Sequence, residues 1–538
     1  MLFWNTDQGK FECLSDPPDE ADIFWLVGKC SLQDFPPNFK FGAASAAYQI
    51  EGAWNVDGKG ESIWDRMVHN QPGMISNRSN GDVASNSYNL WREDIKLAAE
   101  LRLDYYRFSI SWPRIMPTGL PNNISEAGLK HYNDFIDELL FYSIEPVVTI
   151  YHWDLPVKLQ DLGGWTNPLM VDWFESYADI LFRNYGNRVK TWITINEPIV
   201  ICDFNYNTGA FAPDIQEQEL APYICNKNVL MAHAKAYRLY QREYREKYNG
   251  KLSLANNVLW IDSKESPRDD ELRDLGREHM IGRYSHPIFS REGGWPPSIE
   301  KLMLRVSLKQ GYNESRLPSF TEQEKAFIKG TADFYGFNYY TSRLIRRALP
   351  GERGYWFSNG SPELDAMLEL PPGARHTSID MLPMVPEGLG KMLLYLKNTY
   401  GNVDFLITEN GYPGWQSMND IERVQSIRTH LEHVLLAIKH NVSVIGYTYW
   451  SLLDSFEWIS GYESTFGLYS VDFSDPKRRR KPRLSAKYYA CIINSHSLNI
   501  SHECTKNMDL IGYNANRGHR NSFIDYLLIV SLVRLLNN

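Results

Sequence analysis

The chain has 538 residues, 56 basic against 65 acidic side chains and a formal net charge of −9, and 43% of its residues are hydrophobic. This balance is typical of globular proteins and excludes a disordered chain, a collagen-like chain and a small disulfide-stapled scaffold. The acidic balance argues against a broad phosphate-binding surface, and so against a nucleic-acid partner. Aromatic residues reach 13%, which indicates a large core or flat surfaces on which a ligand stacks.

The chain ends carry no legible targeting signal. Met1–Gln33 has no basic stretch followed by a continuous apolar run, so no signal peptide is legible there. The apolar run Phe523–Leu536 is shorter than the roughly 20 residues that span a bilayer, although a GPI-type tail is an alternative. We expect residues 1–34 to be an irregular extension, residues 494–538 to be a C-terminal extension, and no membrane span.

The six cysteines are sparse, and none forms a CxxC pair. A zinc site is therefore not expected, and no other metal or cofactor is indicated. Cys202 and Cys225 flank one loop-like stretch. They either pair in an oxidising compartment or remain two buried thiols.

Short apolar runs alternate with helix-patterned stretches along the chain, and no linker or internal repeat divides them. The strands we predict, in chain order, are Lys40–Ser45, Tyr105–Ser109, Pro146–Tyr151, Thr191–Asn196, Leu252–Leu259, Phe334–Asn338, Asp404–Thr408 and Val444–Tyr449. The predicted helices are Trp91–Leu101, Leu129–Ser143, Val171–Tyr185, Asn228–Lys247, Glu387–Tyr400 and Ile421–Lys439. Such alternation implies parallel strands joined by helical crossovers.

These strands suit a single (β/α)8 TIM barrel with long βα loops over residues 35–493, although length alone would allow three or four domains. A doubly wound sheet is the alternative. The chain contains neither GxGxxG nor GxxxxGK[ST] to support it.

Polar or aromatic residues follow or close most of the predicted strands. They are Arg107, His152, Asn196, Glu197, Asn338, Glu409, Asn410 and Trp450. In a barrel these residues converge on the face where active sites of this fold lie. Packing alone does not predict such convergence.

Two carboxylates carry the strongest chemical signal. Glu197 and Glu409 each stand where an apolar strand meets a breaker, the first before Pro198 and the second before Asn410-Gly411. A single Glu in such a place is usually a cap or an ion-pair partner. A pair is what glycosidic cleavage needs, because one carboxyl must donate a proton to the leaving oxygen while the other attacks or activates water.

Seven motifs, in one order along the chain, resemble glycoside hydrolase family 1. They lie at 39–52, 106–112, 152–156, 194–198 (Thr-Ile-Asn-Glu-Pro), 336–342, 407–411 (Ile-Thr-Glu-Asn-Gly) and 450–458. The resemblance covers about Phe35 to Ile493 and implies a retaining β-glycosidase on a (β/α)8 barrel. It also implies a secreted or lumenal enzyme, without indicating an oligomeric state.

The resemblance assigns roles to the residues of these motifs. Glu197 matches the acid/base and Glu409 the nucleophile. Arg107 and Tyr340 match residues that hydrogen-bond the nucleophile. Asn338 fits a supporting role at the same site. Residues matching those that bind the sugar are Gln49, His152, Trp153, Asn196, Trp450, Glu457 and Trp458.

The same motifs narrow the substrate to a small-molecule, unphosphorylated β-glucoside. Relatives that act on 6-phosphosugars replace the Glu-Trp pair, which is kept here as Glu457-Trp458. The carboxylate of Glu457 would repel the phosphate of such a sugar. Plant thioglucosidases replace the acid/base by Gln, whereas Glu197 is intact, which favours O-glycosides. A thioglucosidase, a transglycosylase and a non-catalytic glycan- or protein-binding barrel are the alternatives.

One departure bears on the leaving group. Thr465 stands where the family commonly has Arg, beside Glu463 and Ser464, which we expect near the aglycone side.

Overall fold

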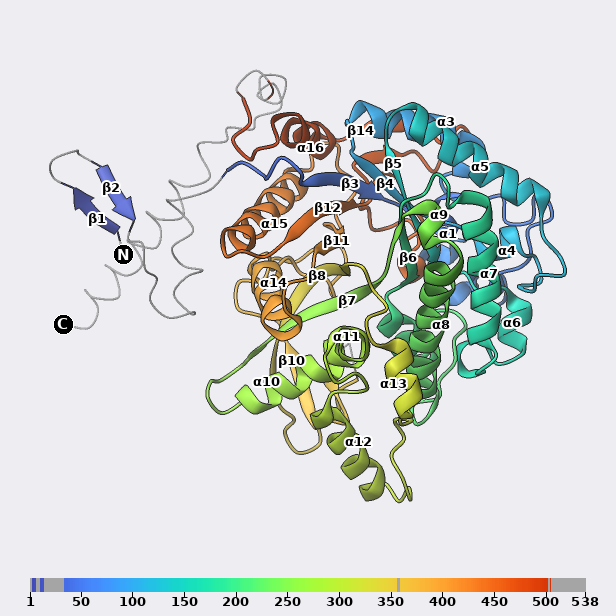
Figure 1. Cartoon of the computed structure of the whole chain (residues 1–538). Coiled ribbons are helices and arrows are strands. Elements are labelled where there is room, and N and C mark those ends of the chain that lie inside the picture. Colours follow the sequence, from blue (N-terminus) through green and yellow to red (C-terminus); the bar gives the residue numbers. More distant parts are fainter. Residues whose placement is uncertain (1, 6–9, 14–32, 356–358, 502–503, 505–538) are drawn as a thin grey trace.

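The computed structural model describes residues 2–5, 10–13, 33–355, 359–501 and 504 (Figure 1). Within them, eight parallel strands close into a barrel, because β11 pairs with both β12 and β8. The barrel strands are β3 (Lys40–Ala44), β4 (Tyr105–Ser109), β5 (Glu145–Tyr151), β6 (Thr191–Asn196), β7 (Lys251–Ser263), β8 (Tyr335–Arg347), β11 (Phe405–Asn410) and β12 (Val444–Trp450). The (β/α)8 prediction is confirmed, and the doubly wound alternative is wrong because the eight parallel strands close on themselves through the β11–β8 pairing.

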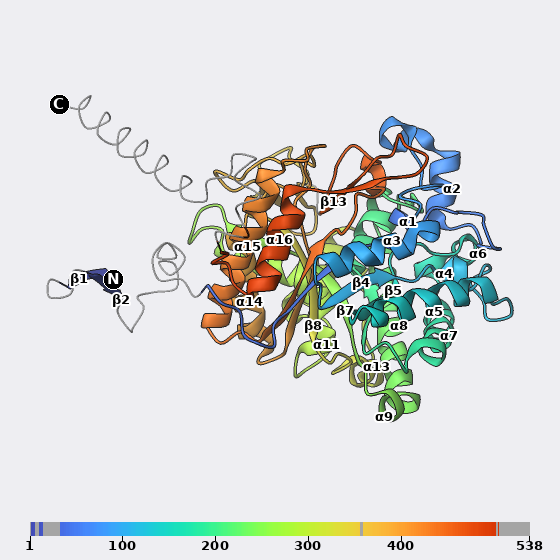
Figure 2. The ribbon, with the colours of Figure 1, turned by 90° about the horizontal axis from the view of Figure 1, so that it is seen from above.

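Helices surround the barrel and cover the outer faces of its strands (Figures 1 and 2). The main ones are α3 (Ser87–Glu100), α5 (Glu126–Phe141), α7 (Met170–Tyr185), α8 (Ala221–Glu243), α14 (Glu387–Tyr400), α15 (Ile421–Lys439) and α16 (Leu484–Ser495). All six predicted helices are present, although the predicted Asn228–Lys247 falls on both α8 and α9 (Arg245–Tyr248). The helix α16 was not among the predictions.

The helix α5 illustrates why these stretches are helical. The Ser125 side chain caps its first turn by accepting a hydrogen bond from the Gly128 N–H. Tyr132, Phe135, Ile136 and Leu139 recur at helical spacing and are buried against the barrel.

Strands β7 and β8 are longer than predicted. They pair as far as Ser263 and Ile345, and the extended end of β8 then pairs antiparallel with β10 (Ala366–Glu369). The charged residues late in β8 interrupt its apolar pattern, so no periodic signal marks the extension of this strand. Val258 pairs with Tyr339 and Trp260 pairs with Ser342, so one residue of β7, Leu259, faces two of β8, Tyr340 and Thr341. This is a β-bulge in β8 beside the barrel mouth.

The chain ends differ in part from expectation. Strands β1 (Leu2–Asn5) and β2 (Lys10–Cys13) pair antiparallel, so this part of the N-terminal extension is regular rather than irregular. The apolar run Phe523–Leu536 lies outside the described residues. No helix that the structure describes is long and apolar enough to cross a membrane.

Two disulfides are present in the described part of the chain. Cys202 bonds to Cys225, which settles the two alternatives in favour of pairing and ties the loop after β6 to α8. Cys491 of α16 bonds to Cys504.

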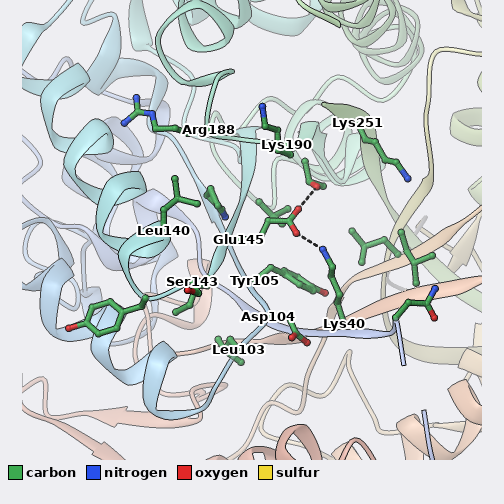
Figure 3. A pocket seen from close by; sticks show the side chains of 18 of the residues that line it. Lys40, Leu103, Asp104, Tyr105, Leu140, Ser143, Glu145, Arg188, Lys190 and Lys251 are labelled. Atoms are coloured by element: carbon green, nitrogen blue, oxygen red, sulfur yellow. Dashed lines mark hydrogen bonds and ion pairs between the residues drawn. The ribbon is translucent and has the colours of Figure 1, made fainter. Parts of the chain in front are cut away.

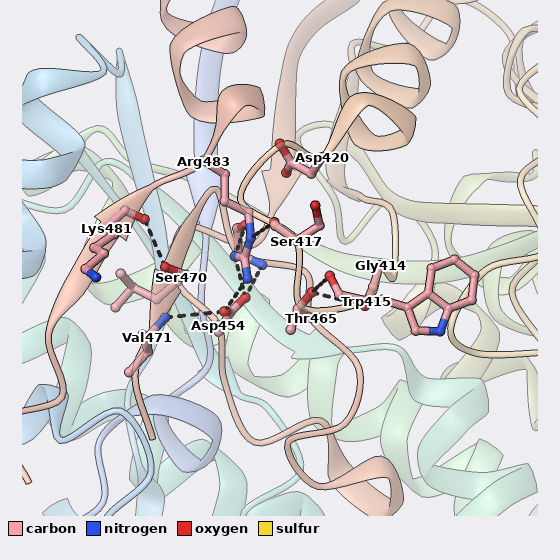
Figure 4. A network of polar contacts seen from close by, with 12 residues as sticks. Gly414, Trp415, Ser417, Asp420, Asp454, Thr465, Ser470, Val471, Lys481 and Arg483 are labelled. Carbon is pink, nitrogen blue, oxygen red and sulfur yellow. Dashed lines mark hydrogen bonds and ion pairs between the residues drawn. The ribbon is translucent and has the colours of Figure 1, made fainter. Parts of the chain in front are cut away.

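A buried ion pair holds the loop after β12 against the start of α16 (Figure 4). Arg483 donates to both carboxylate oxygens of Asp454 at 2.8 and 2.7 Å, and both side chains are almost fully buried. Asp454 also accepts hydrogen bonds from the backbone N–H groups of Gly467 and Val471. The loop between β12 and α16 is therefore fixed through one bidentate pair.

Arg483→Gln should lower the free energy of unfolding by about 3–5 kcal/mol, because it leaves the Asp454 carboxylate buried and unpaired. The matched control is Arg479→Gln, which breaks an exposed pair with Asp475 and should cost less than about 1 kcal/mol. Urea unfolding followed by tryptophan fluorescence measures both. Equal losses in the two variants would contradict the role given to the buried pair.

Candidate active site

A cavity of about 530 Å³ opens where the barrel strands end. Of the residues predicted for the site, it is lined by His152, Trp153, Glu197, Tyr340, Glu409, Trp450, Glu457 and Trp458. The other predicted residues, Gln49, Arg107, Asn196 and Asn338, do not line it but bond to residues that do or to one another. The structure thus gathers the whole predicted set at the carboxyl ends of the strands.

A larger cavity, of about 1090 Å³, lies at the opposite end of the barrel (Figure 3). Lys40, Tyr105, Glu145 and Lys251, which begin β3, β4, β5 and β7, line it. Lys40 forms an ion pair with Glu145. In (β/α)8 enzymes this amino-terminal face serves stability rather than chemistry, so the smaller cavity is the candidate site.

Glu409 accepts hydrogen bonds from two donors. The Arg107 guanidinium donates to its Oε1 at 2.6 Å, and the Tyr340 hydroxyl donates to its Oε2 at 2.8 Å. Burial raises the pKa of Glu409, and the charge of Arg107 followed by the Tyr340 hydrogen bond opposes that rise. Glu409 is therefore the carboxyl of the site that has a cation beside it.

Among the residues that the structure describes, Glu197 forms no ion pair, and the charge of Arg107 is the last of the effects that lower its pKa. The Asn338 amide donates to its Oε1 at 2.6 Å. Burial, together with the charge of Glu409, raises the pKa of Glu197 to about 8. Glu197 therefore holds its proton at neutral pH, while Glu409 has the environment of a carboxylate.

A chain of amide and guanidinium contacts joins the two carboxyl groups. Arg107 donates to Asn196 Oδ1 at 2.7 Å, and Asn338 donates to the same oxygen at 3.1 Å. The Asn338 amide lowers the pKa of both Glu197 and Glu409, so one amide lies within reach of both. The Asn196 amide in turn lies 3.1 Å from His152 Nε2.

Several aromatic and polar side chains cluster at the cavity. His152 stacks on Trp450 with ring centres 5.8 Å apart, and Trp153 packs on Trp458 at 4.8 Å. The Gln49 amide donates to Glu457 Oε1 at 3.2 Å. Burial raises the pKa of Glu457 to about 8. These groups present flat apolar faces and hydroxyl-binding atoms side by side, as a sugar ring requires.

Three residues of the site have strained backbones. The φ angles of Trp153, Glu197 and Trp458 are 74°, 48° and 52°, in the left-handed region that side chains rarely adopt. Such strain persists where the surrounding structure imposes it, and it gathers at functional sites.

Other residues of the cavity were not predicted. Asn257 of β7 hydrogen-bonds Glu197 and lowers its pKa, and the paired amides of Asn256 and Asn257 within an apolar strand were a usable signal. The unpredicted apolar wall includes Val200, Phe204, Phe211, Val258, Leu259, Ile379, Met381, Leu382 and Phe466. These residues come largely from loops and strand extensions, which carry no periodic pattern.

Thr465 does not line the cavity. It is buried, and its hydroxyl donates to the carbonyls of Gly414 and Trp415 (Figure 4). The Arg423 guanidinium bonds its carbonyl, so Thr465 has a packing role at this position. Among the residues that the structure describes, no cluster of His, Cys, Asp or Glu is arranged to hold a metal ion.

Comparison with known proteins agrees with this geometry. The model of glycosyl hydrolase family 1 matches residues 31–498. Myrosinase 1 of Brevicoryne brassicae is 42% identical over 86% of this chain and 98% of its own, and the cytosolic beta-glucosidase of Homo sapiens is 40% identical over 86% and 99%. The solved structure of aphid myrosinase superposes with a TM-score of 0.82 over 86% of this chain and 99% of that one, at 42% identity.

The raised pKa of Glu197 makes stability depend on pH. Glu197 keeps its proton to about pH 8 when folded but only to its usual value of 4.5 when unfolded, so the folded state binds more protons between these values. The free energy of unfolding therefore falls as pH rises through this window, by up to about 1.4 kcal/mol per pH unit for this group. Glu197→Gln removes that contribution, so its stability relative to the parent should grow from pH 5 to pH 8.

Denaturant unfolding at several pH values measures this difference. Burial also raises the pKa of two other carboxyl groups, Asp154 and Glu457, to about 8. Subtracting the parent's curve cancels their contributions to the pH dependence of stability, because both proteins contain them. Curves that run parallel from pH 5 to pH 8 would show that Glu197 is not the protonated group.

Proposed function

The chain belongs to glycosyl hydrolase family 1 and is a β-glycosidase, and we propose that it hydrolyses unphosphorylated β-D-glucosides from their non-reducing end with retention of configuration. The observation that carries this proposal is the unequal environment of two neighbouring carboxyl groups. Glu409 has Arg107 beside it, whereas Glu197 has a pKa raised to about 8. One is suited to attack and the other to proton donation.

In the first step, Glu409 attacks the anomeric carbon while Glu197 donates its proton to the glycosidic oxygen. The bond from the anomeric carbon to that oxygen breaks, the aglycone leaves as an alcohol, and a glycosyl ester forms on Glu409. Tyr340 and Arg107 hold the two carboxylate oxygens before attack, which aims the nucleophile.

In the second step, Glu197 acts as a base. The ester has removed the negative charge of Glu409, which was the second cause of the raised pKa of Glu197, so that pKa falls. Glu197 then takes a proton from water, the water oxygen bonds to the anomeric carbon, and the ester bond to Glu409 breaks. Glu197 ends with its proton restored.

The contacts of Asn338 support retention rather than inversion. One amide acts on both carboxyl groups, which favours the separation of about 5–5.5 Å found in retaining enzymes over about 6.5–9.5 Å in inverting ones. Asn196, which matches the family residue that contacts the sugar 2-hydroxyl, does not itself line the cavity, and its side chain bonds both His152 and Arg107. Trp450 supplies the platform for the ring.

The direct test uses variants of the two carboxyl groups with 4-nitrophenyl β-D-glucoside. Glu197→Ala should lower kcat/KM by about 10²–10⁴-fold, and azide should restore turnover and yield the β-glucosyl azide. Glu409→Gln should lose at least as much, because no covalent intermediate forms. The control is Glu463→Gln. Glu463 was expected near the aglycone side, but it is exposed, accepts a hydrogen bond from Asn77 and does not line the cavity, so this variant should keep the parent's activity. Full activity in either catalytic variant would refute the assignment.

A thioglucosidase is the second candidate, favoured by the 42% identity to the aphid protein named a myrosinase. A thiolate leaves with little protonation, so Glu197→Gln should spare an aryl β-thioglucoside while strongly reducing hydrolysis of the matched O-glucoside. We expect the parent to prefer the O-glucoside in kcat/KM, because its acid is intact. A higher kcat/KM for the thioglucoside would make the second candidate the correct one.

A further inference from the structure

Trp415 lies in the loop after β11, and its side chain is 59% exposed. Every other tryptophan whose side chain the structure describes is buried or half-buried. Figure 4 shows the indole directed away from the polar network that holds its backbone. One flat aromatic face is therefore available at the surface, outside the core in which most aromatic residues of this chain lie.

The backbone beneath the indole is firmly held. Gly414 and Thr465 exchange two backbone hydrogen bonds, of 2.8 and 2.9 Å, and the Thr465 hydroxyl donates to the carbonyls of Gly414 and Trp415 at 3.0 and 3.1 Å. A Cβ added to Gly414 would lie 2.9 Å from Arg423 Nη2, which itself donates to the Thr465 carbonyl, so this close packing depends on the glycine. A ligand that stacks on Trp415 would thus lose little free energy in ordering the loop.

Trp415 lines a small pocket of about 230 Å³, which we call the Trp415 pocket. Ser417, Asn419 and Glu422 are exposed and line it as well. Their side chains form no hydrogen bond or ion pair with any residue that the structure describes, so they are available to a ligand. Together they supply a hydroxyl, an amide and a carboxylate, which both donate and accept hydrogen bonds.

The chemistry of this pocket favours a neutral sugar over other ligands. A sugar ring presents a C–H face that stacks on an aromatic ring and hydroxyl groups that bond to polar side chains. Asp420 and Arg423 also line the pocket but neutralise each other at 2.6 Å, so Glu422 leaves it with a negative charge that disfavours an anion. A quaternary ammonium ligand needs a cage of several aromatic faces, whereas Tyr412, the other aromatic lining residue, is buried.

The Trp415 pocket is separate from the catalytic cavity, although both lie at the carboxyl end of the barrel. None of the residues that line the pocket lines that cavity. The paired backbones of Gly414 and Thr465 connect the two, because Gly414 lines the pocket and Phe466, which follows Thr465, lines the cavity. A glycan on Trp415 would therefore lie beside the wall of the catalytic cavity without occupying it.

We propose that Trp415, with Ser417, Asn419 and Glu422, forms a non-catalytic binding site for a sugar ring of a neutral glycan chain. Binding there would hold the enzyme on material that contains such glycans, while the catalytic cavity stays free for small glucosides. The site stands independently of the proposed β-glucosidase function, because none of its residues belongs to the catalytic machinery.

The test is native electrophoresis of the full chain through gels that contain a soluble neutral polysaccharide, which is mixed-linkage β-glucan, xyloglucan or galactomannan. Binding slows migration relative to a gel without polysaccharide, and the dependence on polysaccharide concentration gives Kd. At least one of the three should retard the parent. Polygalacturonate, an anionic chain, should not retard it, because Glu422 repels its carboxylates.

Variants assign the retardation to the Trp415 pocket. Trp415→Ala should raise Kd by about 10-fold or more, because a stacking indole carries much of the binding free energy at such sites. Trp415→Phe should keep part of the affinity, and Asn419→Ala, which leaves the indole in place, should raise Kd by a smaller factor.

Two controls accompany these variants. Phe141→Ala removes an aromatic side chain that is 77% exposed at the end of α5, outside the pocket, and should migrate as the parent does. Trp415→Ala should hydrolyse 4-nitrophenyl β-D-glucoside with the parent's kcat/KM, since Trp415 does not line the catalytic cavity.

The outcomes separate this inference from the proposed function. A parent that no neutral polysaccharide retards, or that polygalacturonate alone retards, overturns the Trp415 pocket as a sugar site. Retardation that Trp415→Ala leaves unchanged also overturns it, since the glycan would then bind elsewhere, and so does an equal loss in Phe141→Ala. A parent that hydrolyses no glucoside but shows retardation dependent on Trp415 overturns the proposed function and leaves the sugar site standing.

Discussion

Arg107 lies at the centre of the barrel, and its guanidinium contacts residues of three other strands. It donates to Thr149 of β5, Asn196 of β6, and the Thr408 carbonyl and Glu409 of β11. A buried cation needs one anion, and Glu409 supplies it. Glu197 has no second cation available and stays protonated. The division of labour between two chemically identical side chains thus follows from a single buried ion pair.

Two buried arginines of the barrel differ in how their charge is compensated. Arg107 is neutralised within the protein and is screened from the cavity by the residues that it orients. Arg343 bonds neutral acceptors and lines the cavity. The first positions the reactive groups.

The sequence allowed the barrel and most of the site to be predicted because both depend on local patterns. Each barrel strand is an apolar run, and residues such as Glu197 and Glu409 stand where a run meets a breaker. Family resemblance added Gln49 and Tyr340, which no local pattern marks. Arg343 could not be predicted, because its direction depends on a bulge set by pairing with β7. The apolar wall also escaped prediction, since its loops lie far apart in the sequence. The pairing of β1 with β2 shows that an irregular composition can still form strands.

The measurement that tests the central claim most directly is capture of the covalent intermediate. A 2-deoxy-2-fluoro-β-D-glucoside with a good leaving group should form the glycosyl ester but hydrolyse it slowly, because fluorine destabilises the positively charged transition states of both steps. Peptide mass spectrometry should then find one fluoroglucosyl group on Glu409. A label on Glu197, or turnover that releases the α-anomer without any labelled peptide, would contradict the assignment of Glu409 as nucleophile and Glu197 as acid and base.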